Sequence, residues 1–157
     1  MSTIEVGELL YTLTLNITDI REFGVSFVAL MAGERTLPVE GARFDVPFEG
    51  IAAGPKLNGS AEGIDYVRVR ADGAFELHIH ETIRTEDGQN ISAHGDGVAT
   101  LRPEGGIADL HVTMTLFASS KGYTWVNHLP VKGIGTIDTT KQVIQVAAYS
   151  AQVPPGQ

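Results

Sequence analysis

The stretch from Gly54 to Gly88 constrains the fold most, because strand and turn signals alternate along it at short spacing. Asp72-Gly73 and Asp87-Gly88 are pairs that favour the positive φ angles of tight hairpins. Between these pairs, Phe75 to Arg84 alternates between apolar and polar side chains. Successive side chains of a β-strand point to opposite faces, so this segment is predicted to be a strand with one apolar face.

The composition excludes several classes of function. The chain has 157 residues, which suits one domain, and it has no cysteine, so disulfides, thiolate metal sites and thiol nucleophiles are excluded. Its net charge of −8 disfavours nucleic acid and anionic membranes as partners. The first ten residues lack the pattern of a secretory signal, and no apolar run approaches the roughly 18 residues of a membrane helix. We therefore expect a cytoplasmic, soluble protein.

Frequent glycine (18 residues) and the scarcity of helix-period segments favour short strands joined by tight turns. The predicted strands are 9–17, 23–31, 36–39, 42–48, 64–70, 75–84, 90–100, 108–117, 123–131 and 142–151. Residues 50–58 are predicted to be a loop and 95–97 a bulge, with a helical turn near 19–22 or 139–141.

Successive strands with short connections favour an antiparallel meander, and such a sheet loses its exposed edges by closing into a barrel. The sequence thus predicts an all-β, single-domain, mostly antiparallel β-barrel of about nine or ten strands over residues 1–151, with little helix. Residues 152–157 are expected to form a flexible C-terminal tail. A barrel of this size leaves room for one small ligand.

Several short motifs follow one another in a recognisable order. They are Gly54-Pro55-Lys56-Leu57-Asn58-Gly59, Gly63-Ile64-Asp65-Tyr66, Arg70-Ala71-Asp72-Gly73, Thr82-Ile83-Arg84-Thr85-Glu86-Asp87-Gly88 and Tyr123-Thr124-Trp125-Val126-Asn127. In order and spacing the chain resembles the bacterial domain-of-unknown-function family 3237, small single-domain β-barrel proteins, from Leu9 to about Tyr149. The resemblance implies a barrel but no settled activity.

The chain departs from that family's pattern at three positions. Tyr66 stands where the family more often has tryptophan, and His78 and His80 stand where it tends to have an acid and an arginine. We interpret the two histidines as marks of a branch with its own substrate.

His78 and His80 are the leading catalytic candidates. Being two residues apart on one strand, they share a face, and histidine titrates near neutral pH. One interpretation is a general acid/base pair in the barrel mouth. The other is a solvent-facing polar strand face that happens to carry histidines.

A metal site is a further alternative, because His-x-His on a strand directs two imidazoles to one side. A third ligand would come from His94, His111, His128, Glu76 or Glu81, although Glu81 should face the other way. No metal or other cofactor is predicted.

Asp65 and Tyr66 are adjacent on a strand and must face opposite sides, so only one of them lines a cavity. Asp65 shares its face with valines, which makes it a candidate base with a raised pKa or, alternatively, a cap of backbone amides. Tyr123, Trp125 and Asn127, placed on one strand face, are candidates for stacking on and hydrogen bonding to a flat ligand, or for an aromatic cluster of the core or rim.

The sequence argues against two types of functional site. The glycines at 54–59 match neither the Walker nor the dinucleotide spacing, and no helix follows them. No Gly-x-Ser-x-Gly elbow is present, which argues against that type of serine hydrolase.

Two hypotheses of function remain. The first is a cofactor-independent isomerase, hydratase or lyase acting on a small aromatic or carbonyl-bearing molecule, with His78, His80 and Asp65 as catalytic residues and Tyr66 among the substrate-binding ones. The second is a non-catalytic barrel that binds or carries a small hydrophobic ligand. Apolar residues such as Phe48 and Leu129, taken as an exposed rim, leave a homodimer open.

Overall fold

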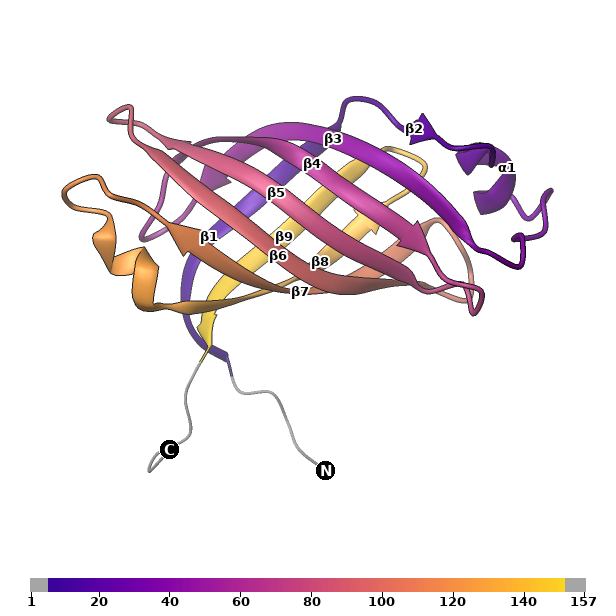
Figure 1. Cartoon of the computed structure of the whole chain (residues 1–157). Helices are drawn as coiled ribbons and strands as arrows, with labels where there is room; N and C mark the ends of the chain where they lie inside the picture. Colours follow the sequence, from indigo (N-terminus) through magenta and orange to yellow (C-terminus); the bar gives the residue numbers. More distant parts are fainter. Residues whose placement is uncertain (1–5, 152–157) are drawn as a thin grey trace.

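The computed structural model describes residues 6–151 and contains nine strands and two short helical segments (Figure 1). The strands are β1 (Val6–Ile17), β2 (Arg21–Glu22), β3 (Ala42–Ala53), β4 (Gly59–Val69), β5 (Phe75–Thr85), β6 (Asn90–Leu101), β7 (Ile107–Phe117), β8 (Pro130–Asp138) and β9 (Val143–Ala151). The α-helix α1 spans Phe27–Met31 and the 3₁₀ helix η1 spans Thr124–His128. The expected C-terminal tail at 152–157 lies outside the described residues.

Eight of the strands close into an antiparallel barrel. Strands β3 to β9 pair in sequence order, β9 pairs with β1, and β1 pairs with β3 to close the ring. The two-residue strand β2 adds to β3 outside this ring. The predicted all-β antiparallel barrel of nine or ten strands with little helix is confirmed.

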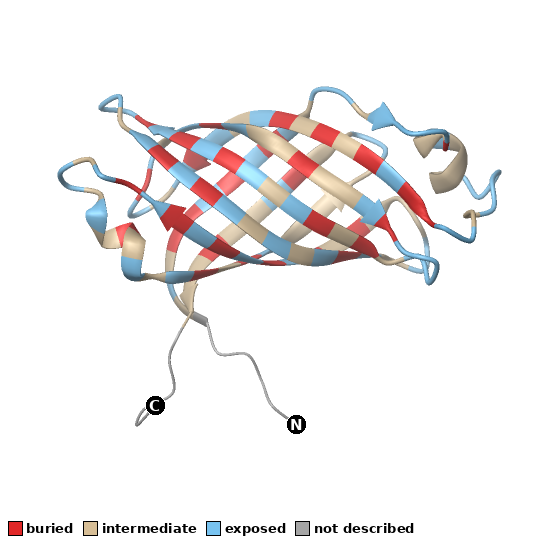
Figure 2. Cartoon of the chain, viewed as in Figure 1, coloured by how far each residue is buried: buried red, intermediate tan, exposed pale blue. Residues whose placement is uncertain are grey.

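Buried and exposed residues alternate along the strands, as Figure 2 shows by the change of colour from one residue to the next. In β7, for example, Leu110, Val112, Met114 and Leu116 point inward while the residues between them are exposed. The inward side chains fill the barrel as an apolar core. Phe48 belongs to this core at 4% exposure and Leu129 is half-buried, so the expectation that they form an exposed apolar rim is wrong.

Several inward glycines let neighbouring strands approach closely. A Cβ atom at Gly59, Gly63 or Gly135 would overlap a backbone carbonyl oxygen of the adjacent strand. Glycine at such positions is a common feature of strongly coiled barrel strands. Of the loop predicted at 50–58, residues 50–53 belong instead to β3, and residues 54–58 form the connection to β4.

Two predicted strands are helical instead. Residues 23–31 contain α1, where the Ser26 hydroxyl accepts a hydrogen bond from the Ala29 amide at 3.2 Å and caps the helix. An apolar run of this length does not distinguish strand from helix by periodicity alone. Residues 36–39 form no strand, and 124–128 form η1 ahead of β8.

Two smaller predictions also differ. The β6–β7 register runs without interruption through Gly95–Gly97, so the predicted bulge is absent there. Residues 21–22 form β2, and residues 139–141 form a turn rather than a helix.

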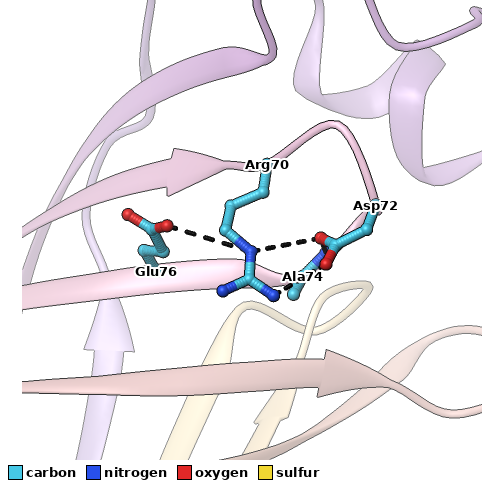
Figure 3. A network of polar contacts seen from close by, with 4 residues as sticks. All are labelled: Arg70, Asp72, Ala74 and Glu76. Atoms are coloured by element: carbon cyan, nitrogen blue, oxygen red, sulfur yellow. Dashed lines mark hydrogen bonds and ion pairs between the residues drawn. The ribbon is translucent and has the colours of Figure 1, made fainter.

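The hairpin between β4 and β5 sets the register of the two strands that matter for the site. Asp72 accepts hydrogen bonds from Arg70 (2.7 Å to Nη2) and from the Ala74 amide (3.1 Å), and Arg70 also lies 3.8 Å from Glu76 (Figure 3). The bond from Arg70 lowers the pKa of Asp72. Gly73 has φ of +88°, as the predicted Asp-Gly turn requires.

No helix within residues 6–151 has the length and apolar character needed to cross a membrane.

Candidate functional site

Two carboxyl groups lie inside the apolar barrel. Asp65 on β4 is 6% exposed and Glu81 on β5 is 5% exposed, and within residues 6–151 they are the only charged side chains that are buried. They are neighbours across two adjacent strands, since Asp65 pairs with Ile79 and Glu81 pairs with Gly63. This diagonal placement lets both side chains face the same part of the interior.

The interior holds two small cavities of about 40 Å³ each. Tyr11, Asp65 and Glu81 line the first among otherwise apolar side chains. The second lies beside Asp65 and is closed by Ile20 and Phe27, from the connection between β1 and β3. Asp65 borders both cavities, as does Ile144 of β9. Each cavity has room for water but not for an organic substrate.

The Asp65 side chain faces the barrel interior and also accepts a hydrogen bond from the backbone of the barrel wall. Its Oδ1 accepts a hydrogen bond from the backbone N–H of His78 at 3.0 Å. The β4–β5 pairing is interrupted beside this bond, between the pairs Asp65–Ile79 and Arg68–Glu76. Burial raises the pKa of Asp65 to about 7, while the bond from His78 and the charge of its imidazole act in the opposite direction.

Glu81 has no comparable support. Its Oε1 is buried and has no hydrogen-bond partner among the described residues. Burial raises the pKa of Glu81 to about 7. Tyr11, 1% exposed, has its pKa raised by burial and by the nearby charge of Glu81. The first cavity therefore combines two carboxyls and a phenol.

His78 and His80 lie on the outer face of β5, so their expected position inside the barrel mouth is wrong. The apolar face of the strand fills the core, which leaves the polar face to solvent. His78 Nδ1 lies 2.6 Å from Asp96 Oδ1 on β6. The ring of His80 stacks with His94 at 6.3 Å and meets the ring of Tyr66 edge-on at 5.9 Å. Tyr66 thus lies outside as well, opposite to Asp65.

No third ligand among the described residues joins His78 and His80 to complete the metal site considered above. Within residues 6–151, no group of three or more His, Asp or Glu side chains is arranged to hold a metal ion. Glu81 faces the interior, away from the two histidines, as the strand alternation predicts.

Tyr123, Trp125 and Asn127 do not share a strand face, because this segment forms η1 and the residue before it. Asn127 makes two 2.8 Å hydrogen bonds to the backbone of Ala118, and the Tyr123 hydroxyl donates to Asp87 at 2.8 Å. Trp125 packs against the edge of the core. None of the three lines either interior cavity.

The sequence analysis did not identify Tyr11 as a site residue, and it considered Glu81 only as a possible metal ligand. Glu81 is an acid on the apolar face of its strand, which is the same signal that identified Asp65. Tyr11 gives no such signal, because a tyrosine among leucines is ordinary core composition.

Solved structures share this fold along nearly the whole chain. A β-barrel-like protein from Acinetobacter baumannii matches with a TM-score of 0.75 and 20% identity, covering 97% of this chain and 98% of that one. A protein of unknown function from Clostridium acetobutylicum matches with a TM-score of 0.74 and 20% identity, covering 92% and 98%. An enzyme from Penicillium herquei matches with a TM-score of 0.64 and 19% identity, covering 97% and 99%.

No curated protein is significantly similar in sequence. The family model described as "Protein of unknown function (DUF3237)" matches residues 10–150. The chain therefore belongs to the DUF3237 family.

Proposed function

We propose that this protein is a cofactor-independent acid–base enzyme of the isomerase, hydratase or lyase type, in which Asp65 and Glu81 move the protons. The observation that carries the proposal is that both carboxyls face one cavity and have pKa values raised to about 7. At neutral pH such a pair supplies one group that accepts a proton and one that donates it. In this proposal Asp65 and Glu81 take the catalytic role that the sequence suggested for His78 and His80, which lie on the outer face of the barrel.

A structural role accounts for Asp65 only in part, through its hydrogen bond from the His78 amide, and does not account for Glu81. Buried charges that stabilise a fold are matched by an opposite charge or by several hydrogen bonds. Within residues 6–151 no cation is buried with Asp65 and Glu81, and Glu81 Oε1 has no partner. Two acids without a buried cation in an apolar core lower stability, and perturbed groups of this kind concentrate at functional sites.

The walls of the cavity favour an uncharged substrate. Two acids, with no cation buried beside them among the described residues, would repel a carboxylate or a phosphate, and the net charge of −8 acts in the same sense. The remaining lining is apolar, with Leu13, Leu110 and Val112 among its residues. A small aromatic or carbonyl-bearing molecule matches this lining in polarity, with its carbonyl oxygen accepting a hydrogen bond from one protonated carboxyl of the pair.

Substrate entry requires the interior to widen, since each cavity is about 40 Å³. The connection 18–41 covers one end of the barrel (Figure 1) and contributes Ile20 and Phe27 to the second cavity. Its strand β2 pairs with β3 at only two positions. We place the entry route here, by displacement of this segment, which we call the cap.

The similarity to an enzyme from Penicillium herquei agrees with catalysis in this fold without specifying a reaction. The alternative is a carrier that holds the same uncharged molecules. The apolar lining of both cavities favours that alternative equally, whereas the buried Glu81 carboxyl, whose Oε1 has no hydrogen-bond partner among the described residues, favours catalysis.

Proton exchange separates the two functions without knowledge of the natural substrate. The protein is incubated in D₂O with a panel of small neutral ketones and aldehydes, and loss of the α-proton signal is followed by NMR. We expect the wild type to accelerate exchange of at least one compound, Asp65→Asn and Glu81→Gln to lose at least tenfold of that rate, and His128→Gln to keep it. Binding of a compound with no exchange, or exchange unaffected by either carboxyl variant, would contradict the proposal.

A further inference from the structure

We infer that His78 is a positioning residue that acts through the barrel wall, holding Asp65 as the base of the pair and leaving Glu81 as the acid. The assignment of base and acid rests on the proposed function. The coupling between His78 and Asp65 does not, because it concerns the titration of Asp65 alone.

The first step is the bond through the wall. The His78 side chain points to solvent, but its backbone N–H points at Asp65 Oδ1, 3.0 Å away. In an uninterrupted ladder this N–H would donate to a backbone carbonyl of β4. The β4–β5 pairing is interrupted, however, between Asp65 and Arg68. The carboxyl of Asp65 therefore accepts the hydrogen bond from the His78 amide in place of a β4 carbonyl. This bond favours the ionised form of Asp65.

The second step is the placement of the imidazole. Asp96 lies directly opposite His78 in the β5–β6 register, and its carboxylate is 2.6 Å from Nδ1. This contact fixes the ring against the outer wall on the far side from Asp65. A protonated imidazole held there favours a negative charge on Asp65, across a wall one strand thick.

The third step is the contrast with Glu81. Glu81 accepts no hydrogen bond at Oε1 from any described residue, and burial is the single cause that raises its pKa. Two carboxyls in one cavity with unequal support lose their protons in order, the supported one first. Asp65 is then the carboxylate and Glu81 the carboxylic acid at the start of a reaction.

Other titratable groups surround both ends of this arrangement. Those facing the interior beside Asp65 are Glu81 and Tyr11. Those on the outer wall around His78 are Tyr66, Arg68, Glu76, His80, His94 and Asp96. Among them, the described contacts join His78 only to Asp96, so substitutions at 78 and 96 test the coupling selectively.

The test is a pH titration of the two carboxyl carbons by ¹³C NMR in the wild type and in four variants. We expect Asp65 to titrate below Glu81 in the wild type. His78→Gln keeps the backbone donor but removes the imidazole, so it should raise the pKa of Asp65 by about 0.5 or more and leave that of Glu81 within about 0.2. Asp96→Asn, which frees the imidazole, should raise the pKa of Asp65 by less than His78→Gln does.

Two further variants make the result specific. His78→Lys restores a cation at this position and should return the pKa of Asp65 toward its wild-type value. His111→Gln removes an exposed histidine of β7 and should move neither carboxyl. All four variants are on the outer face, where substitution leaves the core intact.

An Asp65 titration that His78→Gln does not change, or a Glu81 titration that moves as far as that of Asp65, would overturn the inference. So would a wild type in which Glu81 titrates first. The titration needs no substrate, so a protein that never shows turnover would remove the proposed function and leave the coupling intact. If turnover is found, His78→Gln should move the acidic limb of the kcat/KM profile to higher pH.

Discussion

Gly63 lies directly opposite Glu81 in the β4–β5 ladder, and both positions face the barrel interior. A Cβ atom at residue 63 would stand 2.8 Å from Glu81 Cα and 2.9 Å from the ring of Phe48, and it would overlap the His80 carbonyl oxygen. The absence of a side chain at Gly63 is what allows Glu81 to occupy the wall at this point.

We therefore expect Gly63→Ala to lower the free energy of unfolding by about 3 kcal/mol, because rigid backbone atoms must move to admit the methyl group. Gly133→Ala is the matched control. There the methyl would meet side-chain atoms, Val112 Cγ2 at 2.6 Å and Val146 Cγ1 at 3.1 Å, and we expect about 1 kcal/mol. Urea denaturation of the two variants gives the comparison, and equal losses would show that backbone overlap is not what makes Gly63 necessary.

The raised pKa values predict how stability depends on pH. Burial raises the pKa of Asp65 from 3.8, and that of Glu81 from 4.5, to about 7. Between about pH 4 and pH 7 the folded protein holds protons that the unfolded chain has released, so these groups make the free energy of unfolding fall as pH rises through that window. Above it the contribution is constant.

Asp65→Asn and Glu81→Gln each remove one of these groups, and the asparagine still offers an acceptor to the His78 amide. Above pH 7 each variant should be more stable than the wild type by on the order of 2 kcal/mol, and the difference should vanish near pH 4. Chemical denaturation at a series of pH values measures this. Glu49→Gln, on the exposed outer face of β3, should show no such trend.

The Asn127 side chain anchors η1 to the end of β7 through its two hydrogen bonds to the backbone of Ala118. Asn127→Ala leaves the buried N–H and C=O of Ala118 without these partners, so we expect a loss of about 2 kcal/mol in stability. Thr124→Ala, at an exposed position of the same helix, should change stability by less than about 0.5 kcal/mol. A thermal melt with no difference between the two variants would contradict this role.

Phe27 closes the second cavity and packs edge-on against Phe44, with ring centroids 5.3 Å apart. If the cap is the entry route, Phe27→Ala should speed the entry of a small apolar probe such as benzene or xenon. The methyl signals of Ile144, which border both cavities, report its arrival by NMR. Val28→Ala, 72% exposed on the same helix, is the control. Unchanged exchange in Phe27→Ala would place the entry route elsewhere.

The alternation of side chains in the central strands was sufficient to predict the barrel. Segments such as Phe75–Thr85 and Ile107–Phe117 carry their apolar face so regularly that their strands and approximate ends follow from the sequence. The same rule places Asp65 and Tyr66 on opposite faces of their strand. It also predicts that Glu81 faces away from His78 and His80.

Which face points inward was decided by the tertiary structure for the histidine strand, because closure places the larger apolar surface in the core and leaves the imidazoles outside. Local pattern also failed where the chain leaves the barrel. Ser26 caps a helix in an apolar run, and residues 124–128 coil into η1 beside β7.

The sequence by itself thus determined the central strands, the barrel and the acid on an apolar face at Asp65. Only the folded chain decided that Glu81 and Tyr11 share a cavity with it, and that the backbone of His78 reaches Asp65 through the wall. The physical reason is that alternation assigns each residue to a face of its own strand. The meeting of residues from β1, β4 and β5 depends on how far neighbouring strands are shifted, and inward glycines such as Gly63 permit that close approach.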